Sequence, residues 1–169
     1  KGIPVLLEAA RVLREEGRFF RLRVVGDGPE RSRLKQQSVA LGLSDLVTFT
    51  GILQGAALED ALRDVQAVVM PSIWGETAGL AAIEHMMRGR LVIASAIGGP
   101  AEVVGDAGFV FEAGDPRGLA ACMRRVFDDP SAAWAVGIQA RQRAEQLFRV
   151  DRMGEDHSSL YRRVTAGQR

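Results

Sequence analysis

Two glutamates, Glu76 and Glu84, have the spacing in this chain that points most directly to chemistry. Glu76 stands in a short loop after the apolar run 67–70, and Glu84 follows eight residues later. Leu80 and Ile83 recur at helical spacing, which predicts a helix that begins just before Leu80. The free N–H groups at the start of this helix can hold an anion between the two carboxylates. Such an arrangement suits a sugar phosphate.

A longer pattern surrounds these glutamates. Residues 71–84 read P-S-I-W-G-E-T-A-G-L-A-A-I-E, and Gly98-Gly99 and Glu102 follow them. This pattern resembles the nucleotide-sugar-binding half of the retaining glycosyltransferases of the GT-B fold, family 4 type, which consist of two facing Rossmann-like domains. Four shorter segments appear in the order of that family: Lys1-Gly2, Gly26-Asp27-Gly28-Pro29, Phe49-Thr50-Gly51 and Gly114-Asp115-Pro116. The resemblance covers nearly the whole chain.

The fold class predicted from apolar periodicity and from this resemblance is α/β. We expect a Rossmann-like three-layer sandwich with a parallel sheet, which forms one half of a GT-B fold. The strands are predicted at 20–26, 47–50, 67–70, 91–95 and 108–111, with amphipathic helices between them. Asp115, Ser131 and Asp151 are the predicted caps of the last three helices. In the family, a strand that ends in Gly-Arg precedes the Lys-Gly pair. The resemblance therefore implies that residues 1–169 are the C-terminal domain of a glycosyltransferase without its first strand.

The resemblance also implies a set of residues that bind the diphosphate of the donor. Lys1 is expected to act as a charge clamp on the phosphates, and the N–H groups of Gly79 and Leu80 are expected to cradle them. Thr77 and Ala78 belong to the same loop and are included in this donor-binding set. No metal is expected, because the sequence has no Asp-x-Asp motif. No other cofactor is expected, and the donor is a nucleotide-diphosphate sugar such as a UDP- or GDP-sugar.

Four further residues have roles by resemblance. Glu76 is the expected catalytic residue, in contact with sugar hydroxyls near the reacting carbon, and Glu84 is expected to accept hydrogen bonds from the ribose. We expect Glu84 to be partly buried, because it shares a helical stripe with Leu80; the alternative is that both glutamates are solvated charges. Ile52 and Leu53 are expected to lie against the base. A plain loop that covers the core is an equal alternative for Ile52 and Leu53.

Several other residues have more than one interpretation. The run Gly26-Asp27-Gly28-Pro29 is interpreted as a tight turn, because Arg31 stands where a dinucleotide fingerprint needs glycine. Gly98-Gly99 either lets the backbone approach a ligand or forms a flexible turn. Trp74 either lines a sugar pocket or packs in its loop, and packing is preferred. His85 and His157 are interpreted as packing or surface residues, and Cys122 as inert core.

The composition fits one soluble α/β domain. The chain has 169 residues, of which 47% are apolar and 25% are charged, with a net charge of +1. This balance gives no sign of nucleic-acid binding. The expected location is the cytoplasm or the inner face of the membrane, with any membrane contact made through the missing N-terminal domain, which is also the expected protein partner.

The function predicted from these residues is the donor-binding half of a retaining, hexosyltransferase-like enzyme that acts on an unknown acceptor. Two alternatives are a catalytically silent nucleotide-binding module and half of a sugar-nucleotide epimerase. We expect the isolated chain to be inactive, because one wall of the site is missing. We also expect it to be unstable or to self-associate through exposed sheet edges.

Overall fold

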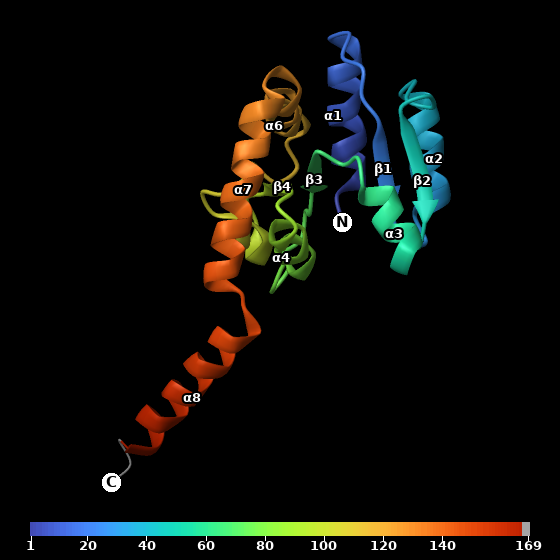
Figure 1. Cartoon of the computed structure of the whole chain (residues 1–169). Coiled ribbons are helices and arrows are strands. Elements are labelled where there is room, and N and C mark those ends of the chain that lie inside the picture. The colour runs from blue at the N-terminus through green and yellow to red at the C-terminus, as the bar shows by residue number, and fades with distance from the viewer. Residues whose placement is uncertain (167–169) are drawn as a thin grey trace.

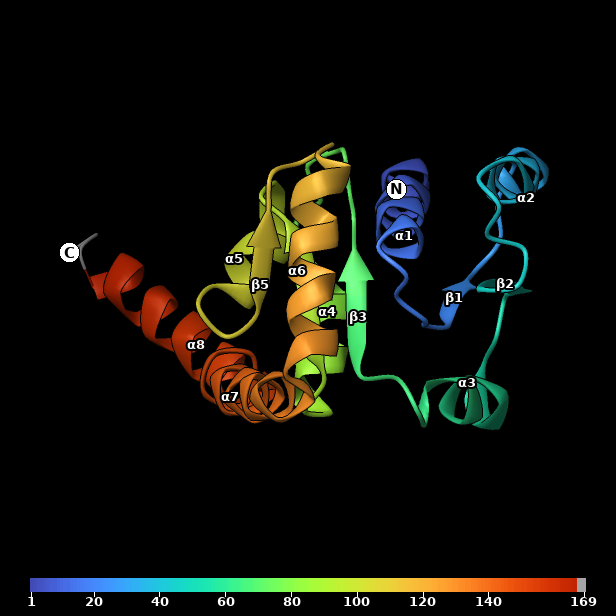
Figure 2. The ribbon, with the colours of Figure 1, turned by 90° about the horizontal axis from the view of Figure 1, so that it is seen from above.

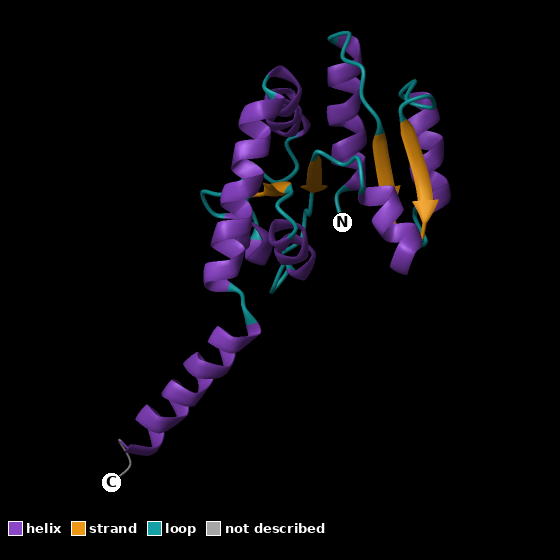
Figure 3. Cartoon of the chain, in the orientation of Figure 1, coloured by secondary structure: helices purple, strands orange, loops and turns teal. Residues whose placement is uncertain are grey.

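Short strands alternate with helices along the first two thirds of the chain, and only helices follow (Figures 1 and 3). The structure is a computed structural model that describes residues 1–166. The elements are α1 (Ile3–Glu15), β1 (Leu22–Val25), α2 (Arg31–Ala40), β2 (Val47–Gly51), α3 (Gly55–Leu62), β3 (Ala67–Met70), α4 (Leu80–Met87), β4 (Leu91–Ser95), α5 (Gly98–Val104), β5 (Phe109–Phe111), α6 (Pro116–Asp128), α7 (Pro130–Leu147) and α8 (Val150–Ala166).

The strands are parallel, as predicted, but they form two sheets and not one. β1 pairs with β2, and β3, β4 and β5 form a second sheet in that order. Figure 1 shows the two groups of strands on either side of the N-terminus. The prediction of one continuous sheet is wrong because, within residues 1–166, no strand joins β1 to β3.

Helices cover both faces of the three-stranded sheet and create two cores. Side chains alternate along β4, so that Leu91 and Ile93 join a core with α1 and α6. Val92 and Ala94 face the other way and pack with α4, α5 and α7. In Figure 2, α6 lies in front of the strands, and α4 and α5 lie behind them. The predicted three-layer, Rossmann-like α/β arrangement is confirmed.

Aspartate side chains cap the starts of α6 and α7. Asp115 precedes α6 and accepts a hydrogen bond of 2.9 Å from the N–H of Arg117, as predicted. The predicted cap at Ser131 is wrong. Asp129 caps α7, because its side chain accepts from the N–H of Ala132 at 2.9 Å and from the Ser131 hydroxyl at 2.7 Å. The predicted cap residue Asp151 lies inside the first turn of α8.

Helix α8 extends away from the rest of the molecule (Figure 1). None of its residues is buried. Among residues 1–166, no helix is both long and apolar enough to cross a membrane.

Candidate functional site

Glu76 lies in the loop between β3 and α4, at the edge where the parallel strands end. Open parallel α/β sheets bind ligands at this edge. Gly79 ends the loop in the left-handed region, with φ of 58°, and α4 begins at Leu80. No side-chain hydrogen bond caps this helix. The N–H groups of its first turn are therefore available to an anion.

The carboxylate of Glu76 is held by two side chains from different parts of the chain. The ammonium of Lys1 donates to Oε1 of Glu76 at 2.8 Å, and the hydroxyl of Ser72 donates to the same oxygen. The hydrogen bond from Lys1, and next the one from Ser72, lower the pKa of Glu76, although partial burial opposes them. Glu76 is therefore an ionised acceptor at neutral pH, close to a cation 75 residues away in the sequence.

Gly2 places Lys1 beside this loop. Its φ of 72° lies in the left-handed region, and a Cβ at this position would stand 1.7 Å from the carbonyl oxygen of Pro71. Only glycine allows the backbone to approach the end of β3 so closely. The Lys1-Gly2 pair thus brings the ammonium of Lys1 to Glu76 through a backbone contact.

Two adjacent glycines, Gly98 and Gly99, hold the Glu76 loop from the side of β4. The N–H of Gly99 donates to the carbonyl of Glu76 at 2.6 Å. A Cβ on Gly99 would stand 2.6 Å from the carbonyl oxygen of Thr77, and one on Gly98 would stand 2.7 Å from that of Glu76. The two interpretations offered from the sequence, ligand approach and flexible turn, both miss this role. The glycines let two loops pack backbone against backbone.

Two buried serines, for which the sequence pattern indicates no role, link the same loops. The hydroxyl of Ser95, at the end of β4, donates to the carbonyl of Ser72 at 2.6 Å. Ser72 then donates its own hydroxyl to Glu76. Both serines are almost fully buried. The available signal for Ser72 was its place in the P-S motif; Ser95 ends an apolar strand and gives no local signal.

Glu84 is exposed, and the expectation of partial burial is wrong. The buried positions of α4 are Ala82 and Met86, while Leu80 is 67% exposed. The stripe that contains Leu80 and Glu84 therefore faces outward. In the described part of the chain, Glu84 makes no side-chain hydrogen bond or ion pair. The structure joins Lys1 to Glu76 at 2.8 Å, whereas Glu84 shares with them only the lining of one cavity of about 740 Å³.

The other predicted site residues are divided between the loops. Thr77 and Ala78 are exposed on the Glu76 loop, and Gly79 ends that loop. Ile52 and Leu53 follow β2, and neither lines the cavity with Lys1 and Glu76. Ile52 is 69% exposed, so it does not cover the core. The structure does not bring the loop after β2 to the other site residues.

Trp74 is 72% exposed, and the preferred interpretation that it packs in its loop is wrong. The indole therefore presents apolar surface next to the Glu76 loop.

Cys122 is buried, as expected for a core residue, and this burial raises the pKa of its thiol.

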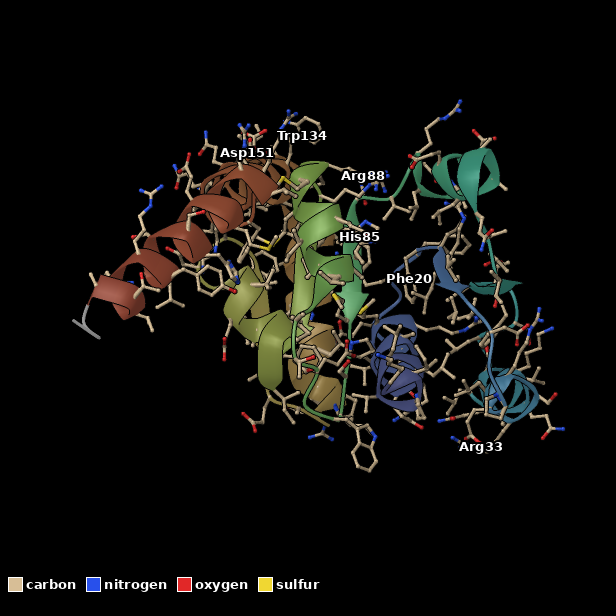
Figure 4. All side chains as sticks on the ribbon, turned by 90° about the horizontal axis from the view of Figure 1, so that it is seen from below. Phe20, Arg33, His85, Arg88, Trp134 and Asp151 are labelled. Carbon is tan, nitrogen blue, oxygen red and sulfur yellow. The ribbon has the colours of Figure 1, made fainter. Side chains whose placement is uncertain are left out.

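His85 is partly buried on α4 and, like Arg88 on the same helix, lines the cavity; Figure 4 labels both residues. Nδ1 of His85 lies 3.3 Å from Nη1 of Arg90. Burial, and next the charges of Arg90 and Arg88, lower the pKa of His85 to about 4. The imidazole is therefore neutral at physiological pH, which agrees with a packing role.

The run Gly26-Asp27-Gly28-Pro29 forms a tight turn between β1 and α2. Gly26 has a φ of 124°, and its N–H donates to the carbonyl of Gly51 at 2.8 Å. The carboxylate of Asp27 accepts from the N–H of Gly28 and pairs with Arg31, both at 2.8 Å. The Asp27 side chain is thus occupied within the turn.

The fold places the chain in a known structural class. Sucrose-phosphate synthase from Thermosynechococcus elongatus matches it with a TM-score of 0.83 and 31% identity, over 99% of this chain and 43% of that protein. The Anabaena protein HepE, solved in complex with UDP-glucose, matches with a TM-score of 0.79 and 26% identity, over 94% of this chain and 45% of that protein. The chain is a Rossmann-like domain of the GT-B glycosyltransferase type.

The sequence pattern of the family "Glycosyl transferases group 1" matches residues 1–143, and the chain belongs to this family. One curated relative is 2-deoxystreptamine glucosyltransferase of Streptomyces kanamyceticus, which is 31% identical over 161 residues. That match covers 94% of this chain and 40% of the relative. The chain thus spans about two fifths of the length of such relatives.

Proposed function

We propose that this chain is the donor-binding half of a retaining glycosyltransferase that moves a hexose from a nucleotide-diphosphate sugar to an acceptor. The observation that carries the proposal is the contact of Lys1 with Glu76 in the loop that leads to the uncapped start of α4, with Glu84 on the same cavity. A diphosphate needs cations and N–H donors, whereas ribose and hexose hydroxyls need acceptors. Family membership and the UDP-glucose in the HepE structure support the same ligand class.

Lys1 and the start of α4 supply the positive end of the site. The departing nucleoside diphosphate gains negative charge as the sugar bond breaks, and fixed donors stabilise that charge without reorganising. The side chain of Lys1 is 76% exposed, so a phosphate can reach its ammonium while it holds Glu76. The N–H groups around Gly79 and Leu80 are the second donor set in this proposal.

Glu76 and Glu84 supply the acceptors. Because its pKa is lowered, Glu76 is ionised and suits a role beside the sugar hydroxyls and the electron-poor anomeric carbon. It does not suit the role of a general acid at neutral pH. Glu84 is exposed, so its carboxylate is available to the ribose hydroxyls. In this proposal both residues contact the donor, and Glu76 is the catalytic one.

The rest of the proposed enzyme lies in a second, N-terminal domain that faces this site and holds the acceptor. We propose that the enzyme acts in the cytoplasm, that any contact with the inner membrane face is made by the second domain, and that transfer needs no metal or other cofactor. Ile52 and Leu53 remain the proposed contacts to the base. That assignment requires the loop after β2 to meet the ligand, because this loop does not line the cavity.

The test compares Glu84→Gln with Glu76→Gln in the chain joined to its second domain. A charge-assisted hydrogen bond contributes on the order of 1.5–3 kcal/mol, so Glu84→Gln is expected to weaken UDP or GDP binding roughly tenfold or more. Glu76→Gln is expected to lower turnover more than affinity, because UDP and GDP lack the sugar that Glu76 contacts. Calorimetric titration and steady-state rates measure the two effects.

The matched control is Glu155→Gln, which makes the same charge change on α8, far along the chain from the loop of Glu76. It is expected to leave both affinity and turnover at wild-type values. If Glu84→Gln binds UDP and GDP as tightly as the wild type, Glu84 does not contact the ribose. If Glu76→Gln keeps full turnover, the proposed catalytic role of Glu76 fails.

A further inference from the structure

A second cavity, of about 380 Å³, lies at the amino ends of β3 and β4, at the opposite end of these strands from Glu76. Its lining comes from the loop after α3, the loop after α4 and the start of α7. Figure 4 shows two of the lining residues, Arg88 and Trp134, on the same side of the molecule. Helix α4 runs from the Glu76 loop to Arg88, so this cavity and the candidate site lie at opposite ends of one helix.

Three arginines line this second cavity: Arg63, Arg88 and Arg90. Arg63 pairs with Asp60, and Arg88 pairs with Glu59 at 2.7 Å. Both ion pairs are exposed to solvent, and exposed ion pairs contribute little to stability. An anionic ligand can therefore replace either carboxylate at low cost.

Arg90 differs from the other two, because it has no carboxylate partner in the described part of the chain. Its side chain is partly buried, and Nη2 donates to the carbonyl of Leu62 at 3.1 Å, while Nη1 lies 3.3 Å from Nδ1 of His85. Burial, and next the positive charge of Arg88, lower the pKa of Arg90. An anion bound between Arg88 and Arg90 would offset the repulsion between these two cations.

One carboxylate, that of Asp64, is found among the described residues that line the second cavity. It accepts a hydrogen bond of 3.0 Å from Nη2 of Arg23, which lies outside the cavity lining. Asp64 is therefore held away from Arg90. The free positive charge of the cavity is that of Arg90.

Trp134 gives the second cavity an aromatic wall. The side chain stands in the first turns of α7, beside Pro130 and Ala133, which also line the cavity, and it is 71% exposed. The face of an exposed indole stacks well on a nucleobase. The cavity volume lies at the lower end of the range for small-molecule sites, which favours a single nucleotide.

We propose that the second cavity binds a nucleoside monophosphate, with its phosphate on the three arginines and its base on the indole of Trp134. Guanidinium groups suit this ligand because they donate pairs of parallel hydrogen bonds to phosphate oxygens. The second cavity is separate from the site proposed for the nucleotide-diphosphate sugar, and this inference holds whether or not that function is correct.

The experiment uses the full-length polypeptide that contains these residues and compares AMP, ribose 5-phosphate and inorganic phosphate by calorimetric titration. AMP is expected to bind at least about fivefold more tightly than ribose 5-phosphate, because only AMP carries a base. Trp134→Ala is expected to remove this difference and to leave the affinity for ribose 5-phosphate unchanged. Because Trp134 is exposed, its replacement leaves the core intact.

Arg90→Gln tests the phosphate contacts. It is expected to weaken the binding of AMP and of ribose 5-phosphate roughly tenfold, because a charge-assisted hydrogen bond to the phosphate is lost. If this variant does not fold, Arg63→Gln takes its place, because the side chain of Arg63 is 80% exposed. The matched control is Arg33→Gln, which makes the same charge change on α2 (Figure 4) and is expected to leave both affinities at wild-type values.

Three results would overturn the proposal. One is that AMP does not bind at low millimolar concentration, and another is that all three probes bind equally well. The third is that Lys1→Ala weakens AMP binding while Trp134→Ala does not, because AMP would then occupy the candidate site. A parallel titration with UDP separates this inference from the proposed function: UDP binding that depends on Glu84 supports the proposed function even where AMP does not bind.

Discussion

Both hydrogen bonds to the Glu76 carboxylate end on the same oxygen. Lys1 and Ser72 both donate to Oε1, so Oε2 has no side-chain partner among the described residues. One oxygen thus fixes the orientation of the carboxylate while the other remains available to a ligand. Ser95 supports this arrangement from beneath through its bond to the Ser72 carbonyl. Because the carboxylate is already fixed, little conformational entropy is lost when a ligand binds to it.

His85 gives a prediction for the dependence of stability on pH. Its folded pKa is lowered to about 4 from 6.5, so between these values the unfolded chain binds a proton that the folded chain refuses. The free energy of unfolding should therefore fall as the pH drops from 6.5 to 4. At about pH 5 the linkage amounts to about 2 kcal/mol, and partial exposure of the ring reduces the expected contribution to about 1 kcal/mol.

Urea unfolding of the wild type and of His85→Gln at about pH 7.5 and pH 5 measures this contribution. Glutamine cannot take up the proton, so the variant is expected to lose less stability over this range than the wild type. The comparison removes the common effect of the carboxylates. Equal losses in the two proteins would show that His85 titrates normally in the folded chain.

The sequence predicted the Glu76 site better than it predicted the surroundings of Glu84. The resemblance assigned Lys1 and Glu76 to the same donor, and the structure places their side chains 2.8 Å apart. In contrast, α4 reads L-A-A-I-E-H-M-M, with apolar residues on several sides. A helix of this composition has no single apolar stripe, so tertiary packing decided that Ala82 and Met86 face inward.

At the scale of elements, the loops after β3 and β4 act as one unit. Gly98 and Gly99 bring the start of α5 into backbone contact with the Glu76 loop, and Ser95 bonds to the same loop. Contacts of this kind carry displacement in one loop to the other. The position of Glu76 therefore depends on residues that touch no ligand.

Gly99→Ala tests this coupling. The added Cβ would stand 2.6 Å from the Thr77 carbonyl oxygen, so the loops must separate. Overpacking of this kind costs about 1–3 kcal/mol, which corresponds to a fall in Tm of roughly 2–10 °C for a chain of this size. Calorimetry measures the shift. The control is Gly28→Ala, where the new Cβ meets nothing within 4 Å and little change is expected. A Tm for Gly99→Ala equal to that of the wild type would show that the two loops are not held together in solution.

Removal of helix α8, in contrast to Gly99→Ala, is expected to leave the stability of the domain almost unchanged. None of its residues is buried, so truncation after Arg149 should change the free energy of unfolding by no more than about 0.5 kcal/mol. Truncation after Asp129 also removes α7, which buries Ala140 and Ala144 in the second core, and should prevent cooperative unfolding. Chemical denaturation of both truncated chains makes the comparison. A large loss on removal of α8 alone would mean that it packs on the domain in solution.

The helix caps show how well the local sequence predicts where a helix begins. Asp115-Pro116 was recognised as a helix start, and the structure shows the predicted bond. Asp129-Pro130 carries the same signal, but Ser131 is also a favoured cap residue, so the local sequence does not decide between them. The positions of the five strands were predicted to within two residues, because each is a short apolar run between turn residues.

At the scale of the whole molecule, strand pairing was the part that the sequence predicted worst. An apolar run indicates that a strand forms, but which edges meet depends on neighbours distant in the chain. β1 and β3 both have the composition of inner strands, with Val24, Val25, Val68 and Val69. Their inner edges nevertheless face a cavity of about 740 Å³, and no described strand lies between them. The composition of a strand therefore indicates that it is covered on both faces, but not which strands lie beside it.

The last prediction concerns sugar transfer by the isolated chain. Lys1, Ser72 and Glu76 meet at a single loop, and the chain covers 40% of the relative 2-deoxystreptamine glucosyltransferase. A transferase must align the acceptor with the donor and exclude water, and misalignment alone removes several orders of magnitude in rate. We therefore expect no measurable UDP release from UDP-glucose in the presence of sugar acceptors. The chain joined to its second domain is the positive control, and Glu76→Gln in that protein is the negative one. Transfer by the isolated chain above the rate of this negative control would show that residues 1–169 form a complete site.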